Sequence, residues 1–376
     1  MTYRRAAIPA LVAGLLITLL LWWAGASAQA LRLPGTTGVL DARSVTELRR
    51  WLVPWSYDPS AGLPSGEPGT GGDADLGTGT RYADLYRTAM QIRFAAVFVF
   101  FLAGALLLIR RLPPTQGRTP ATLLALWAWG PVAGTLAVTV SAPWLIASGG
   151  HGSYRFLPQL AGVAASSGPV VVFAALLTAA LTVLVARVTA KGAAPLPRRS
   201  VPPRAARLAA STGTAVIALS LVVLSYESVA AWMQTSFGGA GLLSEPGDLL
   251  RQWLLLGGWT GPGTTPLGDW LLYRAADVLT LAVVWWALRL LPGLLTRATV
   301  PAMTTGAVCA TVLGLMAGHV LHTAMDGTLT IWGPVHLFSE LGAGVPAALT
   351  FGAIAGVAVH VTLRLSGGSD LDKSLR

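Results

Sequence analysis

Residues 85–110 read LYRTAMQIRFAAVFVFFLAGALLLIR, and residues 272–297 read LYRAADVLTLAVVWWALRLLPGLLTR. Each stretch begins with Leu-Tyr-Arg, continues through an apolar run and ends on an arginine. The two align without a gap as far as Pro114 and Pro301. An apolar run of about 20 residues is long enough to cross the hydrocarbon core of a bilayer as a helix. The pair therefore predicts a duplicated membrane helix.

A second pair of strings extends the duplication toward the N-terminus of each half. LRRWL at residues 48–52 returns as LRQWL at residues 250–254, and Arg-Ala-Ala opens an apolar stretch at both Arg5 and Arg204. Each half then reads as helix, outer segment, helix, basic inner turn, helix, outer turn and helix. Because four crossings is an even number, the two halves have the same orientation, so we predict parallel rather than inverted repeats.

The composition agrees with a membrane protein. Hydrophobic residues make up 53% of the chain and charged residues 11%, whereas about a quarter of the residues of a soluble domain are charged. The sequence predicts an all-α integral membrane protein of about eight transmembrane helices, arranged as two tandem parallel four-helix repeats with extracytoplasmic interfacial helices. The predicted helices lie near residues 8–28, 91–109, 120–146, 165–186, 208–233, 270–296, 299–323 and 341–363.

The predicted organisation has four parts. Residues 1–190 form the first repeat, which includes an extracytoplasmic loop at 29–90, and residues 207–366 form the second. A Pro/Arg-rich cytoplasmic linker at 191–206 joins the two repeats, and residues 367–376 form a cytoplasmic tail. The first helix also fits a cleaved signal peptide, with Ala-Ser-Ala before Gln29. We expect a retained anchor, because the matching segment lies in the middle of the chain.

The distribution of charge predicts the orientation. If both termini lie in the cytoplasm, the inner segments hold 16 of the 26 basic residues but only Asp370 and Asp372 among the acids. Basic residues concentrate on the cytoplasmic side of membrane proteins. We therefore expect a multi-pass plasma-membrane protein of bacterial type, with the lipid bilayer as its partner and a membrane complex as a further candidate partner. The net charge of +10 needs no nucleic acid to explain it.

The loop 29–90 predicts a helix lying in the outer interface. Ser44 and Glu47 have the spacing of a capping box, and apolar side chains follow on one face. We expect four tryptophans to lie at headgroup depth, while the Gly/Pro-rich stretch 56–80 is predicted to be flexible. The predicted interfacial tryptophans are Trp51, Trp55, Trp253 and Trp259.

Ionisable residues concentrate at one level of the second half, the outer ends of its helices. Counting 1.5 Å per residue from the inner basic residues places Glu227, Asp277, His319 and Glu340 about 30–36 Å away. The corresponding positions of the first half are largely neutral. Such residues are functional candidates by default in a membrane helix. The candidate polar cluster consists of Glu227, Arg274, Asp277, His319, His322, His336 and Glu340.

This cluster has two interpretations. His319 and His322 share a helix face, and together with His336 and Glu340 they could bind zinc or copper, or the histidines could hold a haem. The acids and Arg274 could instead relay protons or bind a charged solute. The plainer interpretation is that these residues are polar because they lie at the membrane–water interface, with Arg274 and Asp277 as an ordinary ion pair.

No familiar catalytic signature occurs. The chain has no Walker A loop, no His-Glu-x-x-His and no Gly-x-Ser-x-Gly. Its single cysteine, Cys309, excludes an intrachain disulfide and a cysteine metal cluster. The layout is similar to that of haem A synthases, which also duplicate a four-helix bundle. That family needs histidines in both halves, however, and the first half here has only His151.

We therefore predict a transport, export or envelope-assembly component without catalytic chemistry, and no catalytic residue is assigned. No cofactor is predicted, although haem or a divalent metal fits the histidines. The alternatives are an outward-facing metal- or haem-dependent enzyme that uses the second-half cluster, and a structural scaffold that recruits partners through residues 187–207 and the loop 29–90.

Overall fold

The computed structural model describes residues 3–30, 42–57, 75–114, 117–149, 156–166, 168–189, 201–237, 245–261, 266–325 and 333–366. This part of the chain is all-helical and contains no β-strand. Eight of its helices are long and apolar enough to cross a membrane. Each overlaps one of the eight predicted segments, so the all-α class and the eight candidate spans are confirmed.

The first half contains helices that alternate between long candidate spans and short connecting pieces: α1 (Tyr3–Ala30), α3 (Ala42–Leu52), the 3₁₀ turn η1 (Val53–Trp55), α4 (Asp75–Arg111), α5 (Thr119–Ser148), α6 (Phe156–Ala165) and α7 (Gly168–Thr189). The second half contains α8 (Pro203–Ala218), the π turn η4 (Leu219–Leu224), α9 (Glu227–Thr235), α10 (Pro246–Leu254), α11 (Leu267–Leu294), α12 (Val300–Met325) and α13 (Gly333–Ser366).

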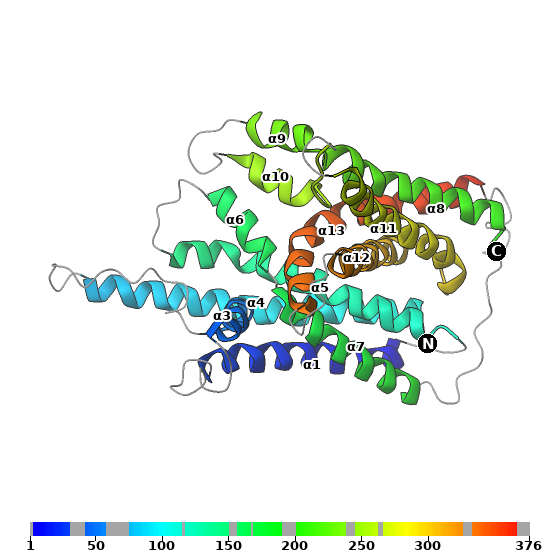
Figure 1. The fold of residues 1–376 in the computed structure, drawn as a ribbon. Coiled ribbons are helices and arrows are strands. Elements are labelled where there is room, and N and C mark those ends of the chain that lie inside the picture. The colour runs from blue at the N-terminus through cyan, green and yellow to red at the C-terminus, as the bar shows by residue number, and fades with distance from the viewer. Residues whose placement is uncertain are drawn as a thin grey trace.

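The long helices lie side by side, and α1 begins at the same end of the bundle at which α13 ends (Figure 1). We call this end the terminal end. The short helices α3, α6, α9 and α10 gather toward the other end, which we call the distal end (Figure 1). An even number of spanning helices places the two ends of a chain on one side, as seen here.

The helices of the two halves pack in the same order. In the first half, α1 packs on α4 and α7, and α5 packs on both α4 and α7. In the second half, α8 packs on α11 and α13, and α12 packs on both α11 and α13. The halves meet mainly through α5, α6 and α7 on one side and α10, α12 and α13 on the other. Cys309 lies buried at this junction, where its Sγ donates to the carbonyl oxygen of Ala125 at 3.3 Å.

Small residues allow α12 and α13 to approach closely. A Cβ atom added at Gly352 would lie 2.8 Å from Val308 Cα, and one added at Gly356 would overlap Thr304 Cα. These two glycines are four residues apart and therefore share one face of α13. Such small-xxx-small patterns are typical of membrane helix pairs, whose association depends on close backbone contact.

The predicted fifth helix, 208–233, is wrong as one continuous element. The α-helix ends at Ala218, the π turn follows, and a new helix begins at Glu227. Two sets of hydrogen bonds stabilise the break. Ser225 Oγ donates to the carbonyl of Ser220 at 2.8 Å, and the backbone of Ser225 and Glu227 pairs with Trp259, which is distant in the sequence. These bonds replace the helical ones that the chain gives up at this point.

Other predicted boundaries also change. The prediction of flexibility across 56–80 is wrong at its end, since α4 already begins at Asp75, whereas residues 58–74 lie outside the described residues. The predicted fourth helix, 165–186, corresponds to α7, which begins at Gly168 with Pro169 in its first turn, where a proline is tolerated; the short helix α6 precedes it. His336 falls between the predicted helices 299–323 and 341–363 but lies in the first turns of α13.

Candidate functional site

A cavity of about 1240 Å³ opens among the helices of the second half at the distal end. Its walls come from the break between η4 and α9, from α10 and the segment that follows it, and from α11, α12 and α13. Among the described residues, the first half contributes only α6, through Pro158, Ala161 and Gly162. The cavity is therefore built by one half almost alone.

Five of the seven residues of the predicted polar cluster line this cavity. They come from three elements that are far apart in the sequence, since Glu227 begins α9, Arg274 and Asp277 lie on α11, and His319 and His322 lie on α12. The other two, His336 and Glu340, belong to α13, but their side chains lie outside the described residues, as does His151.

The central contact is an ion pair between neighbouring turns of α11. Arg274 Nη1 lies 2.6 Å from Asp277 Oδ2, and each side chain is 24% exposed. The Arg274 guanidinium carbon also lies 5.1 Å from the centre of the Trp259 ring, within the range of a cation–π contact. Trp259 is itself held by its Nε1, which donates to the carbonyl of Val222 at 2.8 Å. Arg274 thus ties α11 to the segment after α10.

The two histidines lie one turn apart on α12, and their contacts differ. His319 Nδ1 lies 2.8 Å from the carbonyl oxygen of Leu315. Because a carbonyl can only accept, this nitrogen carries the proton and Nε2 carries the lone pair of the neutral ring. The His322 ring stacks on Tyr273 with centroids 5.2 Å apart. Across the described ranges, no three His, Cys, Asp or Glu side chains are grouped to hold a metal ion.

The broken helix forms the wall opposite α11. Glu227 N donates to the carbonyl of Trp259, and Trp259 N donates to that of Ser225, both at 3.0 Å. Ser225 Oγ also accepts a hydrogen bond from Gly257 N at 3.2 Å. Irregular backbone at the end of a spanning segment is tolerated where it lines a cavity, and π turns are frequent at functional sites. The sequence predicted Glu227 for the site but not this break.

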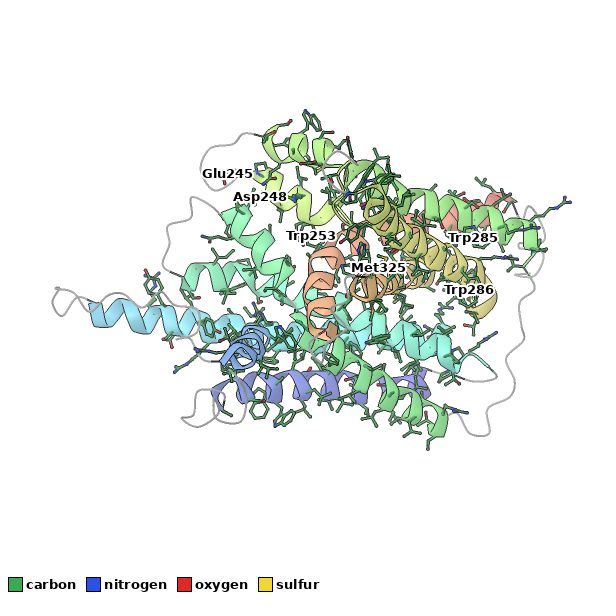
Figure 2. The ribbon with its side chains drawn as sticks, in the orientation of Figure 1. Glu245, Asp248, Trp253, Trp285, Trp286 and Met325 are labelled. Carbon is green, nitrogen blue, oxygen red and sulfur yellow. The ribbon has the colours of Figure 1, made fainter. Side chains whose placement is uncertain are left out.

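The rim on the α9–α10 side is a hydrogen-bonded set. Gln234 Nε2 donates to Asp248 Oδ1 at 2.6 Å, and Arg251 donates to Gln234 Oε1 at 3.2 Å. Figure 2 places Asp248 on α10, on the same side of the molecule as Glu245. The carboxylate of Glu227, by contrast, makes no hydrogen bond or ion pair in the described part of the chain.

The predicted interfacial tryptophans occupy different environments. Trp55 is fully buried in the core of the first half and Trp51 is 9% exposed, whereas Trp253 and Trp259 are half-buried. Residues 42–52 and 246–254 are helical, as α3 and α10, whereas their interfacial position stays a prediction and the Ser44 and Glu47 side chains of the expected capping box lie outside the described residues.

Arg93 is the important residue that the sequence interpretation missed. It lies within the apolar run of the second predicted helix and is 1% exposed. Its Nε donates to Ser141 Oγ at 2.9 Å and its Nη1 to the carbonyl of Pro54. An arginine inside a predicted membrane helix is itself a signal of a specific partner, and this signal was available in the sequence.

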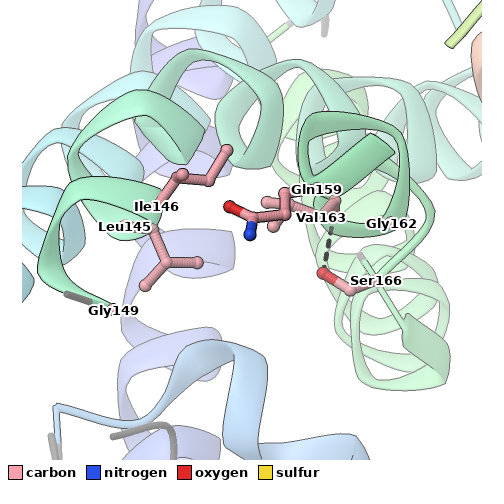
Figure 3. Close-up of a pocket in the computed structure, with 7 residues that line it drawn as sticks. All are labelled: Leu145, Ile146, Gly149, Gln159, Gly162, Val163 and Ser166. Atoms are coloured by element: carbon pink, nitrogen blue, oxygen red, sulfur yellow. Dashed lines mark hydrogen bonds between the residues drawn. The ribbon is translucent and has the colours of Figure 1, made fainter. Parts of the chain in front are cut away.

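A second, smaller hollow of about 340 Å³ lies between the distal end of α5 and helix α6 (Figure 3). Leu145 and Ile146 face Gln159 and Val163 across it, and Ser166 Oγ donates to the carbonyl of Val163 at 2.7 Å (Figure 3). Gly162 lines both hollows. None of the five described residues of the predicted cluster lines this hollow.

The fold and the composition together define a polytopic membrane protein with eight candidate membrane-spanning helices. Comparison with known protein families, with curated proteins and with solved structures finds no match for this chain. Any functional conclusion therefore depends on the cavity and on its chemistry.

Proposed function

We propose that the chain consists of two tandem parallel repeats in the plasma membrane, with both termini in the cytoplasm and the distal end facing outward. The matched strings of the two halves and the shared packing order of their helices support the repeat. The concentration of arginine in the segments at the terminal end supports the orientation. The large cavity then opens on the extracytoplasmic side.

We infer that this cavity binds a small or lipidic solute, and that the protein transports or accommodates that solute rather than transforming it chemically. One observation carries the inference. A cavity of about 1240 Å³ gathers seven charged or histidine residues from four separate helices, α9, α10, α11 and α12. Pockets for small molecules usually measure about 300–1000 Å³ and combine apolar walls with a few polar groups. A discontinuous spanning helix, here η4 and α9, is also typical of solute sites in transporters.

Filling the cavity should abolish binding without unfolding the protein. Gly257 lines the cavity, and a Cβ atom added there meets only Leu221 Cδ1, at 3.4 Å. Gly257→Trp should therefore place its indole in the cavity. We expect a panel of small charged and zwitterionic compounds to contain at least one that raises the melting temperature of the wild type by about 2 °C or more, because binding stabilises only the folded state. The Gly257→Trp variant should not respond to it.

The matched control is Gly293→Trp, the same change at an exposed glycine on α11 with open space around it and no contact with the cavity. This variant should respond as the wild type does. The proposal is contradicted if no compound in the panel acts, or if every active compound also stabilises Gly257→Trp.

A second candidate function, a metal- or haem-dependent enzyme, is favoured by one observation, since His319 and His322 lie one turn apart on the same wall. This candidate predicts stoichiometric zinc or copper by elemental analysis, or a haem absorption band, in protein purified from membranes. The signal should be lost in the His319→Ala/His322→Ala double variant, because neutral imidazole is the ligand. A metal content that is equal in wild type and double variant would contradict this candidate.

A further inference from the structure

The two halves differ at the positions that decide whether a cavity exists. When the register of the matched strings is continued, Trp55 of the first half corresponds to Gly257 of the second, and Arg93 corresponds to Thr280. Gly257 and Thr280 both line the large cavity. Each large side chain of the first half is thus replaced by a small one at the site.

In the first half, Trp55 and Arg93 form a packed plug, by which we mean this pair of buried side chains. Trp55 is fully buried, and its ring lies 5.9 Å from that of Phe94 in an edge-to-face arrangement. The Arg93 guanidinium lies 6.0 Å from the centre of the Trp55 ring. The hydroxyl of Tyr86 donates to the carbonyl of Ser56 at 2.8 Å, which fixes the backbone next to the plug.

The continuity of the first helix also distinguishes the halves. Helix α1 runs unbroken from Tyr3 to Ala30, and Gly25 allows the carbonyl of Trp55 to pack directly against it. The equivalent part of the second half is the break at Ser225, where the chain opens around the cavity. The large cavity therefore corresponds to a volume that the first half fills with an indole and a guanidinium of its own.

The charges around the cavity favour a cation. The described lining residues include three carboxylates, those of Glu227, Asp248 and Asp277, and two guanidinium groups, those of Arg251 and Arg274. Asp277 pairs with Arg274, and Gln234 joins Asp248 to Arg251. This leaves the Glu227 carboxylate as the charged group of the described lining that has no partner. Glu227 is exposed, and hydrogen bonds to an ionised carboxylate are stronger than those to a neutral acceptor, so this carboxylate is the group that an incoming cation would pair with.

The walls suit the rest of such a ligand. Trp259, Trp270 and Tyr273 all line the cavity. Trp270 is oriented by its Nε1, which donates to the carbonyl of Thr260 at 2.9 Å. Aromatic faces attract cations and also bind apolar rings. A ligand with a ring and a positive charge would supply the same two groups that the Trp55 indole and the Arg93 guanidinium supply in the first half.

We propose that the ligand of the large cavity is an organic cation that carries an aromatic or apolar ring, with its charge at Glu227 and its ring between the aromatic walls. The proposal rests on the solute-binding function proposed above, and it adds the chemical class of the solute. The first half, with Trp55 and Arg93 in place, does not take this ligand.

Two probes with one ring system and opposite charge test the proposal. Tryptamine carries an ammonium group on indole, and indole-3-acetate carries a carboxylate. Binding of each is measured by calorimetry on the full chain in detergent micelles. We expect tryptamine to bind more tightly than indole-3-acetate. Glu227→Gln should lower the affinity for tryptamine about tenfold, because it removes a charge-assisted contact. Gly257→Trp should abolish binding.

The controls separate this proposal from the function on which it rests. Glu245→Gln removes a carboxylate near α10 that does not line the cavity, and Gly293→Trp adds an indole elsewhere, so both should bind tryptamine like the wild type. Preference for indole-3-acetate that is lost in Gly257→Trp would overturn the cationic class and leave solute binding intact. Absence of tryptamine binding at millimolar concentration, or binding unaffected by Gly257→Trp, would also overturn the proposal.

Discussion

Replacing Trp55 with alanine is expected to lower the free energy of unfolding by about 3–5 kcal/mol, the range for deletion of a buried tryptophan ring. Trp55 is fully buried, contacts Phe94 and lies below the Arg93 guanidinium. Its loss leaves a void that the fixed backbone beside Tyr86 and Gly25 cannot close. The melting temperature of the purified protein in detergent measures the effect.

The matched control is Trp286→Ala. Trp286 lies on α11 (Figure 2) and is 61% exposed at the surface of the bundle. It should change the melting temperature little, because it leaves no internal void. Free indole should restore part of the stability of Trp55→Ala, since an apolar cavity of this shape binds the ring that was removed. Equal destabilisation by both substitutions would show that Trp55 does not form a plug.

Gly356→Ala is the second substitution with a large expected effect, a loss of about 1–3 kcal/mol from overpacking. The new Cβ atom would overlap Thr304 Cα and lie 2.8 Å from the carbonyl oxygen of Met303. Both are backbone atoms, so no side-chain rotation can make room, and α12 and α13 must move apart. We expect a lower melting temperature and a smaller yield of folded protein from membranes.

Gly293→Ala is the matched control, because a Cβ atom there meets nothing within 4 Å. It also lies in a helix, α11, so it shares the gain in helix propensity over glycine. This variant should be as stable as the wild type or slightly more stable. If Gly356→Ala were equally well tolerated, the close approach of α12 and α13 would not contribute to stability.

The helices were predictable because the bilayer imposes a simple requirement on the sequence. A spanning segment must satisfy its backbone internally and present about 20 apolar residues. Each of the eight runs meets this condition over a single local stretch. The level of the polar cluster was predictable for the same reason, since a constant rise per residue converts chain position into depth. Glu227, Arg274, Asp277, His319 and His322 were therefore identified without knowledge of their contacts.

The sequence interpretation failed where a position depends on a distant partner. The break at Ser225 is stabilised by Trp259, and the burial of Arg93 depends on Pro54 and Ser141. No local periodicity records such contacts. The sequence strings likewise show that Trp55 and Gly257 correspond, but not that one fills a core and the other opens a cavity.

The sequence by itself thus determined the class of protein, the number of candidate spans and the level at which polar groups gather. Only the tertiary structure decided that these groups surround one large cavity, and that this cavity belongs to the second half. The physical reason is that a cavity is the volume left between packed side chains. It depends on how segments far apart in the chain approach one another, and that approach is set by packing rather than by local composition.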